Sequence, residues 1–224
     1  MNRRDFSALA LGSSLAASAF AQGGPIEGRH YKLPAKPVGV PTAKIDVVEF
    51  FWYGCPHCYV FDPALNEWVK KLPADVAFRR VHMLLRPAFR PHHKLFFTLE
   101  SLGLEAQLHG AVFEAFHEAI AQRNGAGVES DADMADLAVK LGVDRAKFTQ
   151  MYASFGVQQK CTQADQLAEA FGIDGVPALG IAGRFWTAPS LNHSMPPLPR
   201  NEQELGLRAL TTTDFLIQRV RSSK

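Results

Sequence analysis

Residues 49–61 read EFFWYGCPHCYVF, an apolar run that begins with a carboxylate and encloses two cysteines separated by Pro-His. The apolar residues up to Tyr53 are typical of a strand that is buried on both faces. Gly54 interrupts this strand, and Pro56 suits the first position of a helix. The stretch therefore predicts a buried strand, a tight turn, and a helix that begins at the two thiols.

The remaining apolar patterns predict a mixed α/β protein in which a helical block interrupts the strands. Strands are expected at residues 44–53, 76–85, 178–182 and 185–186. Helices are expected at residues 56–71, 95–102, 108–120, 134–141, 148–155, 158–171 and 213–222, with a Pro-rich loop at 187–200. Five of these helices fall between the second and third strands, and the first four of them form the helical block. The fold class is therefore α/β with an inserted α-helical block of about 70 residues.

The first 21 residues have the features of a secretory signal peptide. Arg3 and Arg4 are followed by an apolar stretch and by an A-x-A cleavage pattern that ends at Ala21. We expect this segment to direct export from a bacterial cytoplasm, by the general or the twin-arginine route. The expected division of the chain is a signal peptide at 1–21, the first part of the sheet domain at 22–86, the inserted helical domain at 87–157, and the second part of the sheet domain at 158–224.

Charge and cysteine content narrow the function. The formal net charge is +2, with no basic field for nucleic acid, so we expect no nucleic-acid partner. The three cysteines are Cys55, Cys58 and Cys161. A structural zinc site needs four ligands and the Cys55–Cys58 pair supplies two, so no metal is expected. A disulfide within this pair closes too little chain to act as a staple, which favours redox chemistry. Cys161 is expected to be a buried, inert thiol on a helix.

The sequence around the two thiols fits an attacking and a resolving cysteine. With Pro56 as the first helical residue, Cys55 lies at the N-cap, where free backbone N–H groups and the positive helix end stabilise a thiolate. His57 can donate to that thiolate or carry positive charge near it. Cys58 lies one turn deeper and is expected to close the disulfide. Stabilising the reduced thiolate makes the disulfide an oxidant.

Glu49 is a second candidate site residue. A carboxylate flanked by apolar residues in a buried strand is costly unless it is paired or protonated. One interpretation places it beneath the helix that follows, where it exchanges protons with Cys58 through water. The alternative is an acid at the strand end that reaches solvent or pairs with Arg79 or Arg80.

Val176-Pro177 is a third feature of interest. A residue that precedes a proline is extended, so the backbone of Val176 can lie beside the thiols. X-Pro bonds are the ones that adopt the cis form, but the residues alone do not establish a cis bond here.

The motif FWYGCPHCY, Val176-Pro177 and the helical insert together make the chain resemble the DsbA-type thiol:disulfide oxidoreductases. The resemblance covers nearly the whole chain after the signal peptide and implies a thioredoxin-like fold with an inserted α-helical domain. In that family Cys55 would be the nucleophile, Cys58 the resolving thiol and Glu49 the buried acid. Pro177 would be the family's cis proline, and Val176 would offer backbone contacts to a bound peptide. Arg80 stands where some members carry a lysine.

The resemblance also implies a cellular role. Such proteins act in the periplasm, where they donate a disulfide to reduced, unfolded secreted proteins through a mixed disulfide. A quinone-linked membrane partner of the DsbB type then reoxidises them. The Cys55–Cys58 disulfide would be the redox group, with no further cofactor, and the chain would act as a monomer.

Three alternatives remain at this point. A metal-binding or chaperone-like module could use the same thiols. A disulfide reductase or isomerase usually carries an added dimerisation domain, for which residues 22–42 leave no space. Glutathione-linked relatives usually replace the first cysteine with serine, whereas Cys55 is present here. His92, His93, His109 and His117 are expected to be ordinary surface or helix residues.

Overall fold

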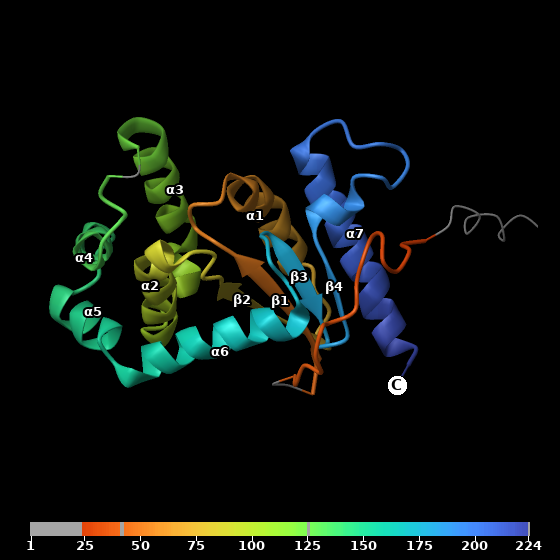
Figure 1. Ribbon diagram of the computed structural model, residues 1–224, viewed down its shortest axis with the longest axis horizontal. Coiled ribbons are helices and arrows are strands. Elements are labelled where there is room, and N and C mark those ends of the chain that lie inside the picture. Colours follow the sequence, from red (N-terminus) through yellow and green to blue (C-terminus); the bar gives the residue numbers. More distant parts are fainter. Residues whose placement is uncertain (1–23, 41–42, 125, 224) are drawn as a thin grey trace, which may run out of the picture.

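The computed structural model describes residues 24–40, 43–124 and 126–223 (Figure 1). The expected signal peptide lies outside this part of the chain. The strands are β1 (Ile45–Phe51), β2 (Val76–His82), β3 (Ala178–Ile181) and β4 (Phe185–Thr187). The helices are α1 (Pro56–Val69), α2 (Arg90–Ser101), α3 (Glu105–Arg123), α4 (Asp131–Lys140), α5 (Arg145–Tyr152), α6 (Phe155–Phe171) and α7 (Glu202–Arg221), with 3-10 turns at Pro87–Phe89 and Pro189–Asn192. None of the described helices is long and apolar enough to cross a membrane.

The four strands form one mixed sheet in the order β2-β1-β3-β4. Strand β1 is parallel to β2 and antiparallel to β3, and β3 is antiparallel to β4. Every residue of β1 is buried, as the unbroken apolar run predicts for a strand covered on both faces. In this register Glu49 lies opposite Arg80 of β2 and Leu179 of β3. The central strand therefore places a carboxylate beside a basic residue of its neighbour.

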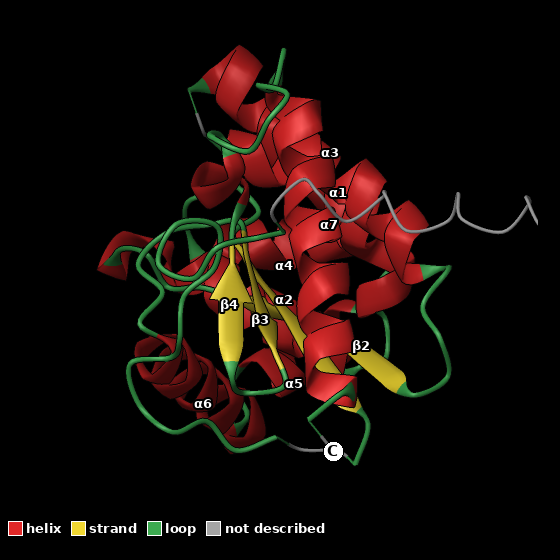
Figure 2. Cartoon of the chain, turned by 90° about the vertical axis from the view of Figure 1, so that its right-hand side faces the viewer, coloured by secondary structure: helices red, strands yellow, loops and turns green. Residues whose placement is uncertain are grey.

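Helices cover both faces of the sheet (Figures 1 and 2). Helices α1 and α7 pack together against one face, where Val47, Leu65 and Ile217 belong to one buried cluster. Helix α6 crosses the other face, and the ring of Phe171 lies 5.4 Å from that of Phe50. Val47 and Phe50 thus face different layers, as the two-residue period of a strand requires.

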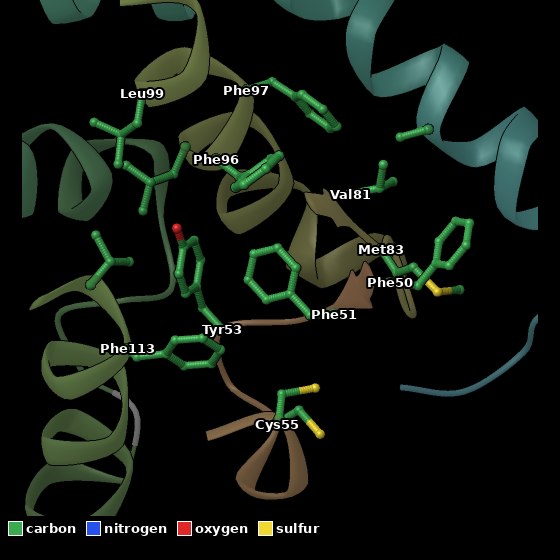
Figure 3. Close-up of a cluster of buried hydrophobic side chains, with 14 of the residues drawn as sticks. Phe50, Phe51, Tyr53, Cys55, Val81, Met83, Phe96, Phe97, Leu99 and Phe113 are labelled. Atoms are coloured by element: carbon green, nitrogen blue, oxygen red, sulfur yellow. The ribbon is translucent and has the colours of Figure 1, made fainter. Parts of the chain in front are cut away.

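The helical block between β2 and α6 contains α2, α3, α4 and α5, and it lies beside the sheet (Figure 1). An aromatic cluster joins it to β1, because the ring of Phe51 lies 5.3 Å from that of Phe96 on α2 and 5.7 Å from that of Phe113 on α3. Tyr53 packs against the same two rings, close to Cys55 (Figure 3). The block therefore packs directly against the stretch that carries the two thiols.

The closing helix is longer than the sequence predicts. The apolar spacing indicates a helix only from Thr213, whereas α7 begins at Glu202, after an Asn201 N-cap whose side chain accepts from the backbone N–H of Glu204. Gly206 weakens the helical signal in this first half because glycine has a low helix propensity. Its role is close packing, since a Cβ at this position would lie 2.7 Å from Cδ2 of Phe61 on α1.

Replacing Gly206 with alanine should therefore destabilise the protein. Overpacking a buried contact costs about 1–3 kcal/mol, which exceeds the gain of up to about 1 kcal/mol that alanine brings to a helix. Gly110→Ala on α3 is the matched control, because a Cβ there would meet nothing within 4 Å. Urea unfolding should show a lower midpoint for Gly206→Ala and an unchanged or higher one for Gly110→Ala. Equal stability of the two variants would contradict the close packing of α7 on α1.

Candidate active site

Cys55 is the N-cap residue of α1, with an extended backbone (φ −84°, ψ 116°) and Pro56 at the start of the helix. Its thiol therefore stands at the positive end of the helix dipole. The side chain is 6% exposed, whereas Cys58, one turn further along α1, is completely buried. Both thiols are free, so the structure represents the dithiol form. An incoming sulfur can reach only the first of the two.

The two cysteines differ strongly in acidity. The hydrogen bond from the Cys58 thiol lowers the pKa of Cys55 from 9.0 to about 6, against the opposing effect of burial. The backbone N–H groups of Cys58 and His57 and the charge of His57 act in the same direction. Burial raises the pKa of Cys58 well above 9.0, and its hydrogen bond to Cys55 adds to the rise. At neutral pH Cys55 is therefore a thiolate that accepts a hydrogen bond from the Cys58 thiol.

Val176 and Pro177 lie against the attacking thiol, and the peptide bond between them is cis. The Sγ atom of Cys55 lies 3.6 Å from the carbonyl oxygen of Val176, as the extended residue before the proline predicts. A cavity of about 590 Å³ borders Val176, Pro177 and His57 and continues to apolar side chains that include Trp186 and Leu205. A concave, largely apolar surface therefore begins at Val176, the residue whose carbonyl oxygen lies beside the reactive sulfur.

His57 is exposed and turned towards α7. Its Nδ1 atom pairs with the carboxylate of Glu202 at the start of that helix, and its side chain is 66% exposed. The side chain is thus held by Glu202, and what His57 provides to Cys55 is its backbone N–H and, more weakly, its charge.

Glu49 is completely buried. Its Oε2 atom accepts a hydrogen bond from Nε of Arg80 at 3.0 Å, whereas Oε1 has no hydrogen-bond partner among the described residues. Arg79 instead pairs with Asp46. The alternative of a solvent-exposed acid is therefore wrong, and the pairing with Arg80 is correct.

Burial raises the pKa of Glu49 from 4.5 to about 8 despite the opposing charge of Arg80. The charge of Glu49 also raises the pKa of Cys58, so the acid and the resolving thiol are electrostatically coupled.

Sequence reasoning missed several polar side chains around Glu49. Asp62 on α1 and Glu105 and His109 on α3 contact Arg80 or one another. Asp62 follows Cys55 by seven residues, which is two turns of a helix. This spacing could have predicted that Asp62 and Cys55 lie on the same face of α1. No local pattern could place α3 beside α1, because that contact depends on how the insert packs.

The extra histidines are expected to be surface or helix residues, and three of them prove to be buried helix residues. His92, His93 and His109 are helix residues, but each is at most 5% exposed. His92 accepts from Nε1 of Trp52, and so joins the insert to the active-site loop. Cys161 is buried as expected, and burial raises the pKa of its thiol to about 11. Within residues 24–40, 43–124 and 126–223, no group of three or more His, Cys, Asp or Glu side chains could hold a metal ion.

Known proteins share this arrangement. Residues 90–193 match the model of the DSBA-like thioredoxin domain. The thiol:disulfide interchange protein DsbA of Burkholderia cepacia is 34% identical over 218 residues, which cover 96% of this chain and 95% of that protein. DsbA of Azotobacter vinelandii is 42% identical over 160 residues, 70% of this chain and 72% of that protein. The crystal structure of Pseudomonas aeruginosa DsbA superposes with a TM-score of 0.76 at 35% identity and covers 89% of this chain and 96% of that one.

The site and the fold together define a thiol:disulfide oxidoreductase, built as a thioredoxin-like fold with an inserted α-helical domain. The extent of the similarity to the curated relatives shows that the chain belongs to the DsbA family.

Replacing Cys58 should raise the pKa of Cys55, because the Cys58 thiol is the largest cause of its acidity. The absorbance of the thiolate against pH should give a midpoint of about 6 in the reduced protein. Cys58→Ala should move this midpoint towards 9.0, the ordinary value for cysteine. Cys58→Ser is the matched control, because its hydroxyl can still donate to the thiolate and should keep the midpoint lower than in Cys58→Ala. A wild-type midpoint near 9.0 would contradict the geometry described.

Proposed function

We propose that this protein is a periplasmic dithiol oxidase that donates its Cys55–Cys58 disulfide to reduced, unfolded secreted proteins. The observation that carries the proposal is the contrast in acidity between Cys55, with a pKa of about 6, and the buried Cys58, whose pKa is raised well above 9.0. A stabilised Cys55 thiolate favours the reduced enzyme, and the oxidised enzyme therefore tends to pass its disulfide on.

The reaction proceeds through a mixed disulfide. A substrate thiolate attacks Sγ of Cys55, a substrate–Cys55 bond forms, and Cys58 leaves with the electron pair of the broken S–S bond. A second substrate thiolate then attacks the substrate sulfur of the mixed disulfide and releases Cys55 as a thiolate. Two electrons pass from the substrate dithiol to the enzyme disulfide. A sulfur of low pKa is a good leaving group, which favours this second step.

Glu49 is the proton donor for the buried sulfur in this scheme. Cys58 leaves as a thiolate in an environment that strongly favours the thiol. A carboxyl group with a pKa of about 8 carries a proton at neutral pH and can transfer it to that sulfur, directly or through water. Oε1 of Glu49, which has no hydrogen-bond partner in the described part of the chain, is available to hold the proton.

Val176 and Pro177 form the substrate-binding edge of the site. The carbonyl oxygen of Val176 lies beside Sγ of Cys55, so the extended backbone of a bound peptide would run alongside it. The cavity next to these residues is lined by apolar side chains, which suit the exposed apolar residues of an unfolded client. Pro56 and His57 act through α1, where Pro56 begins the helix and His57 supplies a backbone N–H to the thiolate.

The remaining parts of the cycle follow from the family. A quinone-linked membrane partner of the DsbB type reoxidises the Cys55–Cys58 dithiol, and no cofactor beyond this disulfide takes part. The protein acts as a monomer after residues 1–21 are removed on export. Residues 87–157 form the inserted domain, and residues 22–86 and 158–224 form the thioredoxin-like domain.

Cys55→Ser should abolish the activity because Cys55 is the sulfur that a client can reach. The oxidised mature protein should transfer its disulfide stoichiometrically to a reduced, unfolded protein, followed as loss of client thiols, whereas Cys55→Ser should transfer none. Cys161→Ser is the control, because this buried thiol lies outside the Cys55–Cys58 pair and its loss should leave the transfer unchanged. Retained oxidation by Cys55→Ser would refute the proposal.

A further inference from the structure

The side chains beneath the two thiols form a buried cluster of five ionisable groups. The guanidinium of Arg80 lies 3.0 Å from Oε2 of Glu49 and 3.5 Å from carboxylate oxygens of Asp62 and Glu105. His109 lies on the opposite side of the last two acids, with Nε2 3.2 Å from Asp62 and Nδ1 3.3 Å from Glu105. None of these side chains is more than 18% exposed. Burial of this degree makes any unbalanced charge in the cluster costly.

The charges of the cluster do not balance without extra protons. Three carboxyl groups, those of Glu49, Asp62 and Glu105, face the single permanent cation of Arg80. Nε2 of His109 lies within hydrogen-bonding distance of Asp62, and Nδ1 lies within ion-pair distance of Glu105, whose Oε1 atom has no hydrogen-bond partner in the described part of the chain. An imidazolium at this position would balance a second carboxylate. The third is then Glu49, the most deeply buried of the three and the one with a pKa raised to about 8.

Other polar groups around His109 fit the imidazolium form. The hydroxyl of Tyr53 lies 3.2 Å from Nδ1, and in the imidazolium form it would accept the single Nδ1 proton in place of Glu105. His82 on β2 is also within electrostatic reach, but burial lowers the pKa of His82 well below its usual value and keeps that ring neutral. The groups that face His109 from α1, α3 and the loop after β1 are therefore acceptors or acids.

The cluster also connects Glu49 to the surface. Asp62, which Arg80 and His109 both contact, lines a cavity of about 460 Å³ between α1 and α3 whose walls include Tyr59 and Glu114. A proton can pass from this cavity to the acids of the cluster while Glu49 itself stays out of contact with solvent. His109 lies at the junction of this path.

We propose that His109 is a positioning residue for the thiol–disulfide reaction, which supplies the second positive charge of the cluster and so governs proton exchange between Glu49 and Cys58. The inference rests on the proposed function in one respect, the transfer of a proton from Glu49 to Cys58. When Cys58 leaves as a thiolate, the Glu49 carboxyl gives its proton to the sulfur and becomes a carboxylate. The cations of Arg80 and His109 stabilise that new charge until solvent returns a proton through the cavity at Asp62.

Replacing His109 with glutamine tests this charge while keeping a polar side chain. NMR of glutamate labelled at its carboxyl carbon would follow the protonation of Glu49 in the reduced protein, the form that the structure represents, with a wild-type midpoint of about 8. His109→Gln should move that midpoint upwards by roughly half a pH unit or more, because the carboxylate loses a nearby positive charge. The pH profile of client oxidation should move in the same direction. His109→Lys, which restores the positive charge, should bring the midpoint back towards the wild-type value.

His117→Gln is the matched control. It changes the same residue type on the same helix. The ring of His117 stacks on Tyr59, 4.2 Å away, and interacts with the backbone of Tyr53 and Cys55, but among the described residues it forms no ion pair with the cluster. It should leave the Glu49 midpoint unchanged. Asp62→Asn should move the midpoint downwards, because the charge of Asp62 raises the pKa of Glu49. A further test leaves His109 in place. In the wild-type protein the ring signals of His109 should show an inflection at the pH at which Glu49 titrates, and this inflection should be missing in Glu49→Gln.

The outcomes separate this inference from the proposed function. The role of His109 alone would be overturned by two results together: the Glu49 midpoint is unchanged or lower in folded His109→Gln, and Glu49→Gln changes the pH profile of client oxidation. If Glu49→Gln kept the wild-type pH profile, the proton transfer to Cys58 would fail and the role of His109 with it, while dithiol oxidation through Cys55 would stand. If His109→Gln did not fold, absence of the His109 inflection in the wild-type protein would overturn the inference.

Discussion

The burial of Glu49 in the central strand is the constraint on which much of the site depends. Both faces of the sheet are covered, so a carboxylate on β1 has no access to water, and the cost of a buried charge reaches several kcal/mol. The register of β1 against β2 offsets part of this cost by placing Arg80 opposite Glu49. Arg80 is in turn surrounded by acids from α1 and α3. The strand pairing, the active-site helix and the insert are thus linked through one buried carboxyl group.

The two thiols show how position along one helix divides two chemical roles. Cys55 at the N-cap accepts from backbone N–H groups and from the Cys58 thiol, and the fall of its pKa from 9.0 to about 6 corresponds to about 4 kcal/mol in favour of the thiolate. Cys58, one turn later, has lost contact with solvent, and its pKa rises. Glu49, when it is ionised, raises the pKa of Cys58 further, which strengthens the contrast. A stable thiolate beside a thiol that resists ionisation is the arrangement expected of an oxidising pair.

The parts of the site that depend on neighbouring residues could be predicted from the sequence, and the parts that depend on distant packing could not. The strand, turn and helix around CPHC and the N-cap position of Cys55 follow from local patterns. The burial of Glu49 does not, because it depends on helices that cover both faces of the sheet. His109 could not be identified, because its two acidic contacts come from α1 and from its own helix after the insert has packed. The first half of α7 is not predicted because Gly206 is a poor helix former, and the reason for a glycine there, its close contact with Phe61, lies on another helix.

The insert therefore does more than cover one end of the sheet. Helix α3 brings Glu105 to Arg80 on β2 and His109 to Asp62 on α1, and α2 brings His92 to Trp52 in the loop before Cys55. Helix α3 contacts Arg80 and Asp62 beside Glu49, and greater access of water to these groups would stabilise ionised carboxylates and lower the pKa of Glu49. A group that is ionised at neutral pH cannot supply a proton to the departing Cys58. The inserted helices thus maintain the low-dielectric surroundings in which a glutamate with a pKa of about 8 can serve a buried thiol.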